Sequence, residues 1–274
     1  MVLSLPLPPE ELTKSEQRIL EYINTNTEAF LFQSIGQLAE RLDISEATVS
    51  RFARHAGFRD FKALKSDVLK QASGPAAKMA GTFHRDEDLS VGAWFHKQMN
   101  YLQTTAEHID EAEFDRAVES VCSARRVFVY GKNASSSLAQ MLFFRLRRIG
   151  IDARLLPSST SEMLEELNQA TADDVVAFFA FSKLSSEGSI LLEHSAHAGY
   201  KTISFVSRTF IPPEERADIV LYACRGEERE YHPMSAPVAL IDALTVSATQ
   251  KLGTRSAEAL SSLYSLKKRF YGAK

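Results

Sequence analysis

The stretch Val175–Val206, VVAFFAFSKLSSEGSILLEHSAHAGYKTISFV, decides the fold of this 274-residue chain. Its apolar beginning stops abruptly at the loop SKLSSE, which is rich in hydroxyl groups. The segment SSEGSILLEHSAHAG then has a helical pattern, and the apolar run KTISFV follows it. A buried strand, a helix and a second buried strand in this order predict parallel strands in a sheet that helices cover on both faces.

The same alternation extends in both directions from residue 126 onward. It predicts five strands, RVFVYG, DARLLP, DVVAFFAFS, KTISFV and DIVLYA, and the further helices SSLAQMLFFRLRRIG, PVALIDALTVSATQKLG and SAEALSSLYSLKKRFYG. Gly150, Gly199 and Gly253 stand where helix C-caps belong. Two helices near 90–108 and 110–123 precede the first strand. We therefore expect an α/β domain over residues 90–274, with a mostly parallel five-stranded sheet.

The bulk composition is typical of a globular protein in a reducing compartment. The chain is 45% hydrophobic and 24% charged, with a formal net charge of −3. No apolar run reaches the roughly 18 residues that a membrane helix needs, and the beginning, MVLSLPLPPEELTKSEQ, has no basic n-region and is broken by prolines. Cys122 and Cys224 show neither metal-ligand spacing nor a disulfide framework. These features predict a cytoplasmic protein without a membrane partner.

The N-terminal residues 1–72 have the pattern of a small bundle of helices. The segment QLAERLDISEATVSRFARHAGF, residues 37–58, places Ala39 where two helices come close and Asp43 at a turn that needs left-handed geometry. Ser45 is a natural N-cap for the second helix. Residues 41–78 carry eight basic and four acidic side chains, although the whole chain is acidic. The pattern predicts a helix-turn-helix DNA-binding domain; a helical module that binds no nucleic acid is the alternative.

If the second helix lies in the major groove, its exposed polar residues are the candidates for contact with DNA. Thr48, Ser50 and Arg51 are placed to approach base edges, while Arg54, Arg59, Lys62 and Lys65 are placed to meet phosphates. Together with the N-cap, the predicted DNA-binding residues are Ser45, Thr48, Ser50, Arg51, Arg54, Arg59, Lys62 and Lys65. Residues 73–89, SGPAAKMAGTFHRDEDL, lose their periodicity and contain Gly and Pro, which predicts a linker.

Two hydroxyl-rich loops follow the first and third predicted strands. In open parallel sheets, ligands bind beyond the carboxyl ends of the strands, where helix N-termini also offer unpaired N–H groups. The first loop has Ser135, Ser136 and Ser137; the second has Ser182, Ser185 and Ser186, and Lys183 adds a charge. Such a site suits a phosphate ester, although serines that only cap two helices would give the same spacing.

The two halves of the chain together resemble the RpiR family of bacterial transcription regulators, over roughly residues 10–255. The stretches that carry the resemblance are SIGQLAERLDISEATVSRFARHAGFRDFKALKSDV, VFVYGKNASSSLA, RLRRIGIDARLL, VAFFAFSKLSSE, GYKTISFVSR, ADIVLYA and PVALIDAL. The resemblance implies a helix-turn-helix domain joined to a sugar isomerase (SIS) domain, an α/β/α sandwich that senses phosphosugars. It also implies ligand contacts at Gly131, Asn133, Ser135, Ser136, Ser182, Lys183, Ser185 and Glu187.

This chain departs from the family's loop motifs in ways that bear on the ligand. The first loop of SIS domains usually reads Gly-x-Gly-x-Ser, and here Asn133 replaces the second glycine. The second loop usually reads Ser-x-Ser-Gly-x-Thr-x-Glu, and here Ala180 and Lys183 replace the first serine and the glycine. Glycine allows backbone N–H groups to approach an oxyanion at positive φ. Either Lys183 substitutes a charged contact for an altered effector, or the pocket has decayed and the domain only mediates association.

Enzymatic activity is a third possibility, because SIS-fold isomerases interconvert aldose and ketose phosphates with a general base. Glu187, His194, His197 and His232 are the candidates, and none has a recognisable partner set for catalysis or for a metal. We expect no enzyme, no metal and no cofactor. We expect instead a regulator that binds double-stranded operator DNA as a homodimer or homotetramer and responds to a phosphosugar effector.

Overall fold

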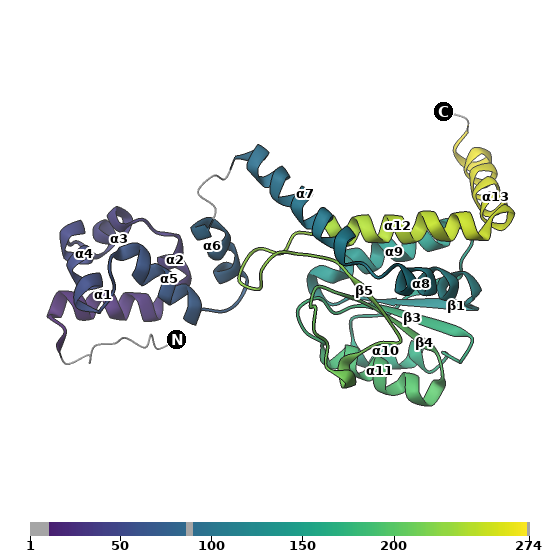
Figure 1. Cartoon of the computed structure of the whole chain (residues 1–274), viewed down its shortest axis with the longest axis horizontal. Coiled ribbons are helices and arrows are strands. Elements are labelled where there is room, and N and C mark those ends of the chain that lie inside the picture. The colour runs from purple at the N-terminus through teal and green to yellow at the C-terminus, as the bar shows by residue number, and fades with distance from the viewer. Residues whose placement is uncertain (1–10, 86–89, 273–274) are drawn as a thin grey trace. The chain divides into compact units, whose positions relative to one another are not determined.

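The computed structural model describes residues 11–85 and 90–272, and the chain divides into two compact units (Figure 1). The first unit comprises Met1–Trp94 together with the later segment Gly226–His232. The second comprises Phe95–Arg225 and Pro233–Lys274. Among the described residues, no helix is both long and apolar enough to cross a membrane.

The first unit is built from short helices: α1 (Lys14–Thr25), α2 (Thr27–Phe32), α3 (Ile35–Leu42), α4 (Glu46–His55), α5 (Phe61–Gln71) and α6 (Pro75–Arg85). Side-chain caps fix where most of them begin. Thr13 and Ser34 form capping boxes with Glu16 and Gln37, and the Asp60 carboxylate accepts the N–H of Ala63 at 2.7 Å. Because each of these helices is too short to be stable alone, packing of their apolar faces must hold them together.

A single apolar cluster supplies that packing. Its members come from all six helices, and fully buried among them are Ile19, Ile23, Phe30, Leu38, Val49, Phe52, Leu64, Val68 and Ala80. The predicted helical bundle is thus confirmed.

Helix α6 lies inside the segment 73–89 for which the sequence predicts a linker. Ala77 and Ala80 join the core of the first unit, and the rings of Phe32 and Phe83 meet edge to face at 5.7 Å. Alanines bury little apolar area each, so the periodicity of this helix is weak in the sequence. Residues 86–89 of the predicted linker lie outside the described residues, and the domain boundaries themselves stay a prediction.

The second unit alternates helices and strands. Its elements are α7 (Val91–His108), α8 (Glu111–Ser123), β1 (Arg126–Tyr130), α9 (Ser136–Arg148), β2 (Ala153–Leu155), α10 (Thr160–Leu167), β3 (Asp174–Phe179), α11 (Ser186–Ala198), β4 (Lys201–Val206), β5 (Ile219–Tyr222), α12 (Ser235–Leu252) and α13 (Thr254–Tyr271), with 3₁₀ turns at Asn133–Ser135 and Pro213–Glu215. The five strands form one sheet in the order β2-β1-β3-β4-β5, and every pair is parallel.

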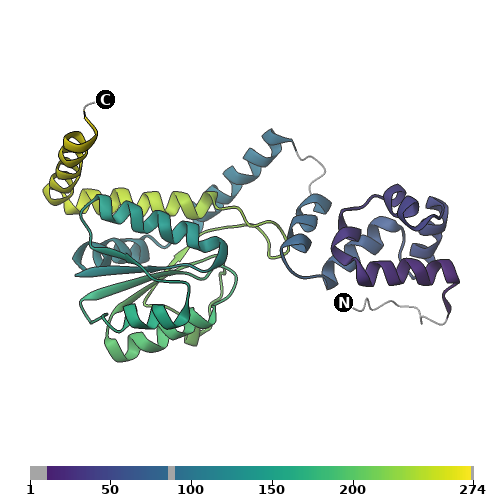
Figure 2. The same ribbon diagram turned by 180° about the vertical axis from the view of Figure 1, so that it is seen from behind.

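Helices cover both faces of this sheet, as Figure 2 shows from behind. Helices α8, α9 and α12 bury one face through a core that includes Val121, Leu142 and Leu244. Helices α10 and α11 bury the other through Met163 and Leu191. The three-layer α/β/α sandwich predicted from the sequence is confirmed, and the sheet is entirely parallel.

The predicted strands and helix ends agree closely with the structure. β4 has the predicted bounds, and the other four strands lie within the stretches predicted for them. Gly150, Gly199 and Gly253 each follow a helix with positive φ, at 86°, 79° and 54°. Helix α10 was not singled out from the sequence; it is short, and only Met163 and Leu167 are buried.

The start of β3 depends on a buried carboxylate. The Asp174 side chain is inaccessible; it accepts Nε of Arg125 at 3.0 Å and the backbone N–H of Thr171 at 2.8 Å, and Nη2 of Arg125 also pairs with it. Burial raises the pKa of Asp174, but the bonds from Arg125 and Thr171 outweigh it and hold that pKa below its usual value.

Replacement of this carboxylate should destabilise the protein strongly. Asp174→Ala removes the buried acceptor that the donors of Arg125 and Thr171 share, and we expect a loss of about 2 kcal/mol in the free energy of unfolding, measured by urea titration. The matched control is Asp152→Ala, because Asp152 is 58% exposed and its contact with Arg126 is 3.4 Å long; there we expect a loss below about 1 kcal/mol. Equal losses would show that Asp174 is no special anchor.

Candidate functional site

The junction between α3 and α4 has the geometry of a helix-turn-helix. Asp43 ends α3 at φ 52° and ψ 54°, in the left-handed region, and Ile44 N–H returns to the carbonyl of Ala39 at 3.0 Å. Ser45 then caps α4 by accepting the N–H of Thr48 at 3.1 Å. The predicted roles of Ala39, Asp43 and Ser45 are confirmed, and α4 leaves the turn as a separate helix with one face uncovered.

The uncovered surface of α4 and its neighbours carries most of the predicted contacts with DNA. Arg51, Arg54, Arg59 and Lys62 are exposed, and Ser45 is exposed beside them. Thr48 and Ser50 are half-buried; the Thr48 hydroxyl lies 2.8 Å from that of Ser45 and accepts Nη2 of Arg51 at 3.4 Å. Arg59 donates to the neighbouring Asp60 at 3.0 Å. The four cations Arg51, Arg54, Arg59 and Lys62 are thus accessible to solvent, and their contacts with DNA stay a prediction.

Lys65 is the exception among the predicted phosphate contacts. It is only 8% exposed, and its ammonium group donates to the carbonyl of Gln33 at 2.8 Å. Burial lowers its pKa to about 8. A lysine held in this way completes the end of α2, so it does not belong to the exposed surface on which Arg51, Arg54, Arg59 and Lys62 lie. Lys62, three residues earlier on α5, points out of the bundle.

The second candidate site lies in the other unit, at the carboxyl edge of the sheet. Strands β1 and β3 are neighbours in register, with Tyr130 opposite Phe178, so the loops that follow them emerge side by side. A cavity of about 470 Å³ opens there. It is lined by Lys132, Asn133, Ser135, Phe179, Phe181, Ser182, Lys183, Leu184, Ser185, Ser186 and Arg225.

The first loop turns without the usual second glycine. Asn133 has φ 52°, one of two positive values among the described residues other than glycine, so it adopts the conformation that glycine would adopt. At Gly131 no other residue type fits, because a Cβ there would overlap the carbonyl oxygen of Ser135. Gly131 is thus needed for close approach within the loop, while Asn133 lines the cavity.

An ion pair joins the two loops behind the cavity. Nζ of Lys132 lies 2.8 and 2.9 Å from the two carboxylate oxygens of Glu187, which is buried at the start of α11. The bond from Lys132 lowers the pKa of Glu187 to about 2. Tyr130 has a buried hydroxyl with no hydrogen-bond partner among the described residues, and burial, together with the charge of Glu187, raises its pKa to about 12.

The eight predicted ligand residues divide into two groups. Asn133, Ser135, Ser182, Lys183 and Ser185 line the cavity, whereas Gly131, Ser136 and Glu187 do not. Gly131 shapes the first loop, and Glu187 acts through Lys132. Ser185 has a second task, because its hydroxyl accepts the N–H of Gly188 at 3.1 Å and caps α11. Ser182 and Lys183 are both exposed on the loop.

Sequence reasoning missed five lining residues, Lys132, Phe179, Phe181, Leu184 and Arg225. Lys132 stands inside the quoted loop motif, so its charge and position could have drawn attention to it. Phe179 and Phe181 end an apolar strand and give no polar signal. Arg225 follows β5, which is two strands away from β3, and only the folded chain brings it to the cavity.

The histidines considered for catalysis or metal binding do not gather at this cavity. His194 packs against the ring of Tyr200 at 5.8 Å, and Nε2 of His232 donates to the carbonyl of Glu227 at 2.9 Å. In the described part of the chain, no group of three or more His, Cys, Asp or Glu side chains could hold a metal ion.

Comparison with known proteins gives a consistent result. Residues 4–75 match the helix-turn-helix domain of the rpiR family. The regulator HexR of Pseudomonas aeruginosa is 25% identical over 248 residues, which are 88% of this chain and 85% of that protein. The SIS domain of an RpiR transcription factor from Sphaerobacter thermophilus has a TM-score of 0.59 at 21% identity and covers 63% of this chain and 97% of its own.

NanR of Vibrio vulnificus, solved in complex with ManNAc-6P, covers 94% of both chains with a TM-score of 0.57 and 21% identity. That match spans the helical domain as well as the α/β domain. The first unit therefore contains a helix-turn-helix domain of the rpiR family, the second has the fold of SIS domains, and the chain as a whole is similar to DNA-binding transcriptional regulators of the RpiR family.

Proposed function

We propose that this regulator senses a phosphorylated sugar, or a related anionic metabolite, in the cavity between the loops after β1 and β3. The observation that carries the proposal is the composition of that cavity. Ser135, Ser182 and Ser185 present hydroxyl groups at the carboxyl edge of a parallel sheet, and Lys183 supplies a positive charge at the same place. Hydroxyl donors beside a cation suit a phosphate ester.

The size of the cavity supports a retained site over a purely structural SIS domain. About 470 Å³ is in the range of pockets that bind small molecules. Lys183 is exposed on the loop, so its long side chain does not fill the space that glycine would leave empty. The loss of the second glycine is compensated because Asn133 adopts the positive φ. NanR, with ManNAc-6P bound, is a structural neighbour of this chain.

The electrostatics of the site favour sensing over catalysis. A general base for isomerisation works best with a pKa near the pH of the reaction. Glu187 is the carboxylate nearest the cavity loops, but the bond from Lys132 holds its pKa at about 2. Such a carboxylate stays ionised and is a weak base, so its role is to hold the two loops together. The chain therefore binds its effector without transforming it, and it acts as a symmetric oligomer on paired half-sites.

Two lysines on α5 test which side of the first unit faces DNA. Lys62→Gln should weaken DNA binding uniformly across sequences and lower the salt dependence by about one charge, because an exposed phosphate contact is lost. Lys65→Gln should leave the salt dependence unchanged and lower the free energy of unfolding by about 2 kcal/mol, because Gln33 loses a charged donor. Fluorescence anisotropy at several salt concentrations measures the first effect. If Lys65→Gln lowered the salt dependence and Lys62→Gln did not, the surface around Lys62 would not be the DNA-binding surface.

A serine of the cavity wall, with a serine outside it as the control, tests the sensing proposal. Ser182→Ala should weaken binding of phosphosugars, measured by calorimetry against a panel of hexose and pentose phosphates, while DNA binding without sugar stays intact. We expect about a tenfold loss if one hydrogen bond to a charged oxygen disappears. The control is Ser136→Ala, because Ser136 is exposed but does not line the cavity. A flat response of the unmodified protein across the panel would favour the structural alternative.

The ion pair behind the cavity gives a pH-dependent prediction. Lys132→Met should raise the pKa of Glu187 from about 2 toward its ordinary value of 4.5, as followed by NMR titration. In the unmodified protein, the contribution of this pair to stability is present above about pH 4.5 and is lost as the pH falls toward about 2. The stability difference between protein and variant should therefore shrink over that interval. Lys183→Met, which removes a lysine from the cavity wall, should leave the pKa of Glu187 in place.

A further inference from the structure

Arg225 belongs to the wall of the candidate effector cavity, although it follows β5 and not β1 or β3. It is 8% exposed, and its guanidinium carbon lies 4.4 Å from the centre of the Phe181 ring. Phe181 stands directly before Ser182 in the second hydroxyl loop. The arginine is thus packed on the same loop that supplies the hydroxyl groups of the cavity.

Arg225 also holds the base of a loop whose remaining residues belong to the other unit. Its Nε donates to the carbonyl of Pro233 at 3.2 Å, so the two residues on either side of Gly226–His232 are bonded to each other. Both Arg225 and Pro233 belong to the second unit, whereas the residues between them belong to the first. The chain therefore leaves the second unit after Arg225 and returns to it at Pro233, and the hydrogen bond between these two residues holds the exit and the return together.

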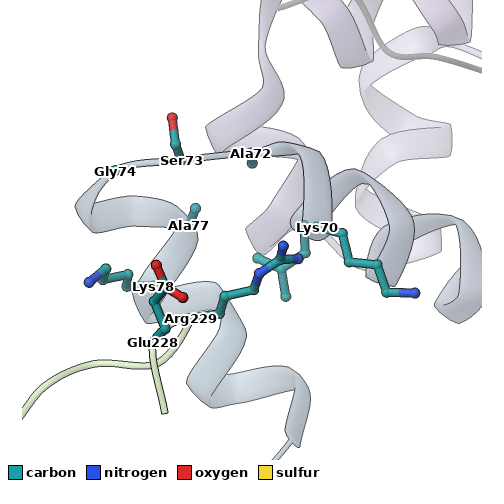
Figure 3. A pocket seen from close by; sticks show the side chains of 9 residues that line it. Lys70, Ala72, Ser73, Gly74, Ala77, Lys78, Glu228 and Arg229 are labelled. Carbon is teal, nitrogen blue, oxygen red and sulfur yellow. The ribbon is translucent and has the colours of Figure 1, made fainter. Parts of the chain in front are cut away.

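The segment Gly226–His232 is packed closely within the first unit. The Tyr231 N–H donates to the buried hydroxyl of Thr82 on α6 at 2.8 Å, and the Tyr231 ring lies 6.0 Å from that of Trp94. The backbone carbonyl of Arg229 approaches Gly81 so closely that a Cβ there would overlap it. Figure 3 shows Glu228 and Arg229 beside Lys78 of α6. Helix α6 is thus paired with a segment from the far part of the sequence.

We propose that Arg225 binds the anionic effector and transmits its presence to α6 through the segment Gly226–His232. This inference rests on the proposed function, because it assigns a regulatory path to the same cavity. An anion in the cavity attracts the guanidinium group, which is held now by the Phe181 ring and the Pro233 carbonyl. Any resulting shift acts on the base of the segment, and the close contact at Gly81 carries it to a helix that shares the core of the DNA-binding bundle.

For this to be regulation, the effector must bind two arrangements of the segment unequally. The geometry provides for this difference, because the Nε–H of Arg225 that donates to the Pro233 carbonyl belongs to a guanidinium group, the kind of donor that a phosphate recruits. In one arrangement, Arg225 keeps its hydrogen bond to the Pro233 carbonyl. In the other, Arg225 binds the effector instead. The partner class is an anion with at least one phosphate-like group.

Hydrogen–deuterium exchange of the full chain with inorganic phosphate as the probe tests this path. The reference is chloride at the same ionic strength. In the unmodified protein, phosphate should slow exchange in the loop 181–187 and change exchange in 226–232 and 75–85. Arg225→Gln alters the proposed path at the cavity, and Gly81→Ala alters it at α6. In both variants, phosphate should no longer change the exchange of residues 75–85. Gly81→Ala should keep the slowed exchange at 181–187, because Gly81 is not part of the cavity wall.

Gly92→Ala is the matched control, because a Cβ on Gly92 of α7 would meet nothing within 4 Å. It should behave like the unmodified protein, and circular dichroism verifies that each variant is folded. If phosphate leaves 181–187 unchanged in the unmodified protein, the proposed effector site itself is overturned. If 181–187 responds but 75–85 does not, or if Gly81→Ala retains the response at 75–85, the site stands and the path through Arg225 is overturned.

Discussion

The in-register parallel pairing of β1 with β3 is the constraint on which the cavity of the second unit depends. Tyr130 lies opposite Phe178, so both strands end at the same level and their loops leave the sheet together. A shift of one residue would turn the strands' side chains to the opposite faces. It would also separate Lys132 from Glu187, whose bonds of 2.8 and 2.9 Å join the loops. The cavity thus exists because the sheet fixes where its walls begin.

The departures from the usual SIS loop motifs have different physical consequences. Asn133 replaces a glycine and still has φ 52°, which a short polar side chain tolerates. Lys183 replaces the other glycine, and the backbone of Lys183 does not have a positive φ. At this position the second loop therefore lacks the conformational range of glycine and has a charged side chain instead. A ligand bound here meets hydroxyl groups and an ammonium group, and less bare backbone than a glycine-rich loop would offer.

Much of the fold follows from local patterns, and the site follows only in part. Apolar runs predicted the strands and glycine C-caps predicted the helix ends. A parallel strand that is buried on both faces consists almost entirely of apolar residues, so it can be recognised from the sequence alone. The cap at Ser45 and the left-handed turn at Asp43 were equally local. Lys65 could not be assigned in this way, since its burial against Gln33 depends on α2 and α5 packing together. Arg225 needed the order of all five strands to reach the cavity.

A sensing domain can act on a DNA-binding domain only where the chain connects their structures. The sequence suggested one connection, a linker at 73–89, yet Ala77 and Ala80 of that segment are buried in the first unit's core. Helix α6 is therefore packed into the first unit, although the sequence predicted a linker there. The segment Gly226–His232 packs on this helix, and the chain enters the second unit at both of its ends, at one of them through a residue of the cavity wall. In the path proposed above, the two chain crossings are bonded to each other through Arg225 and Pro233, and this connection differs from a single flexible linker, which behaves as a random coil.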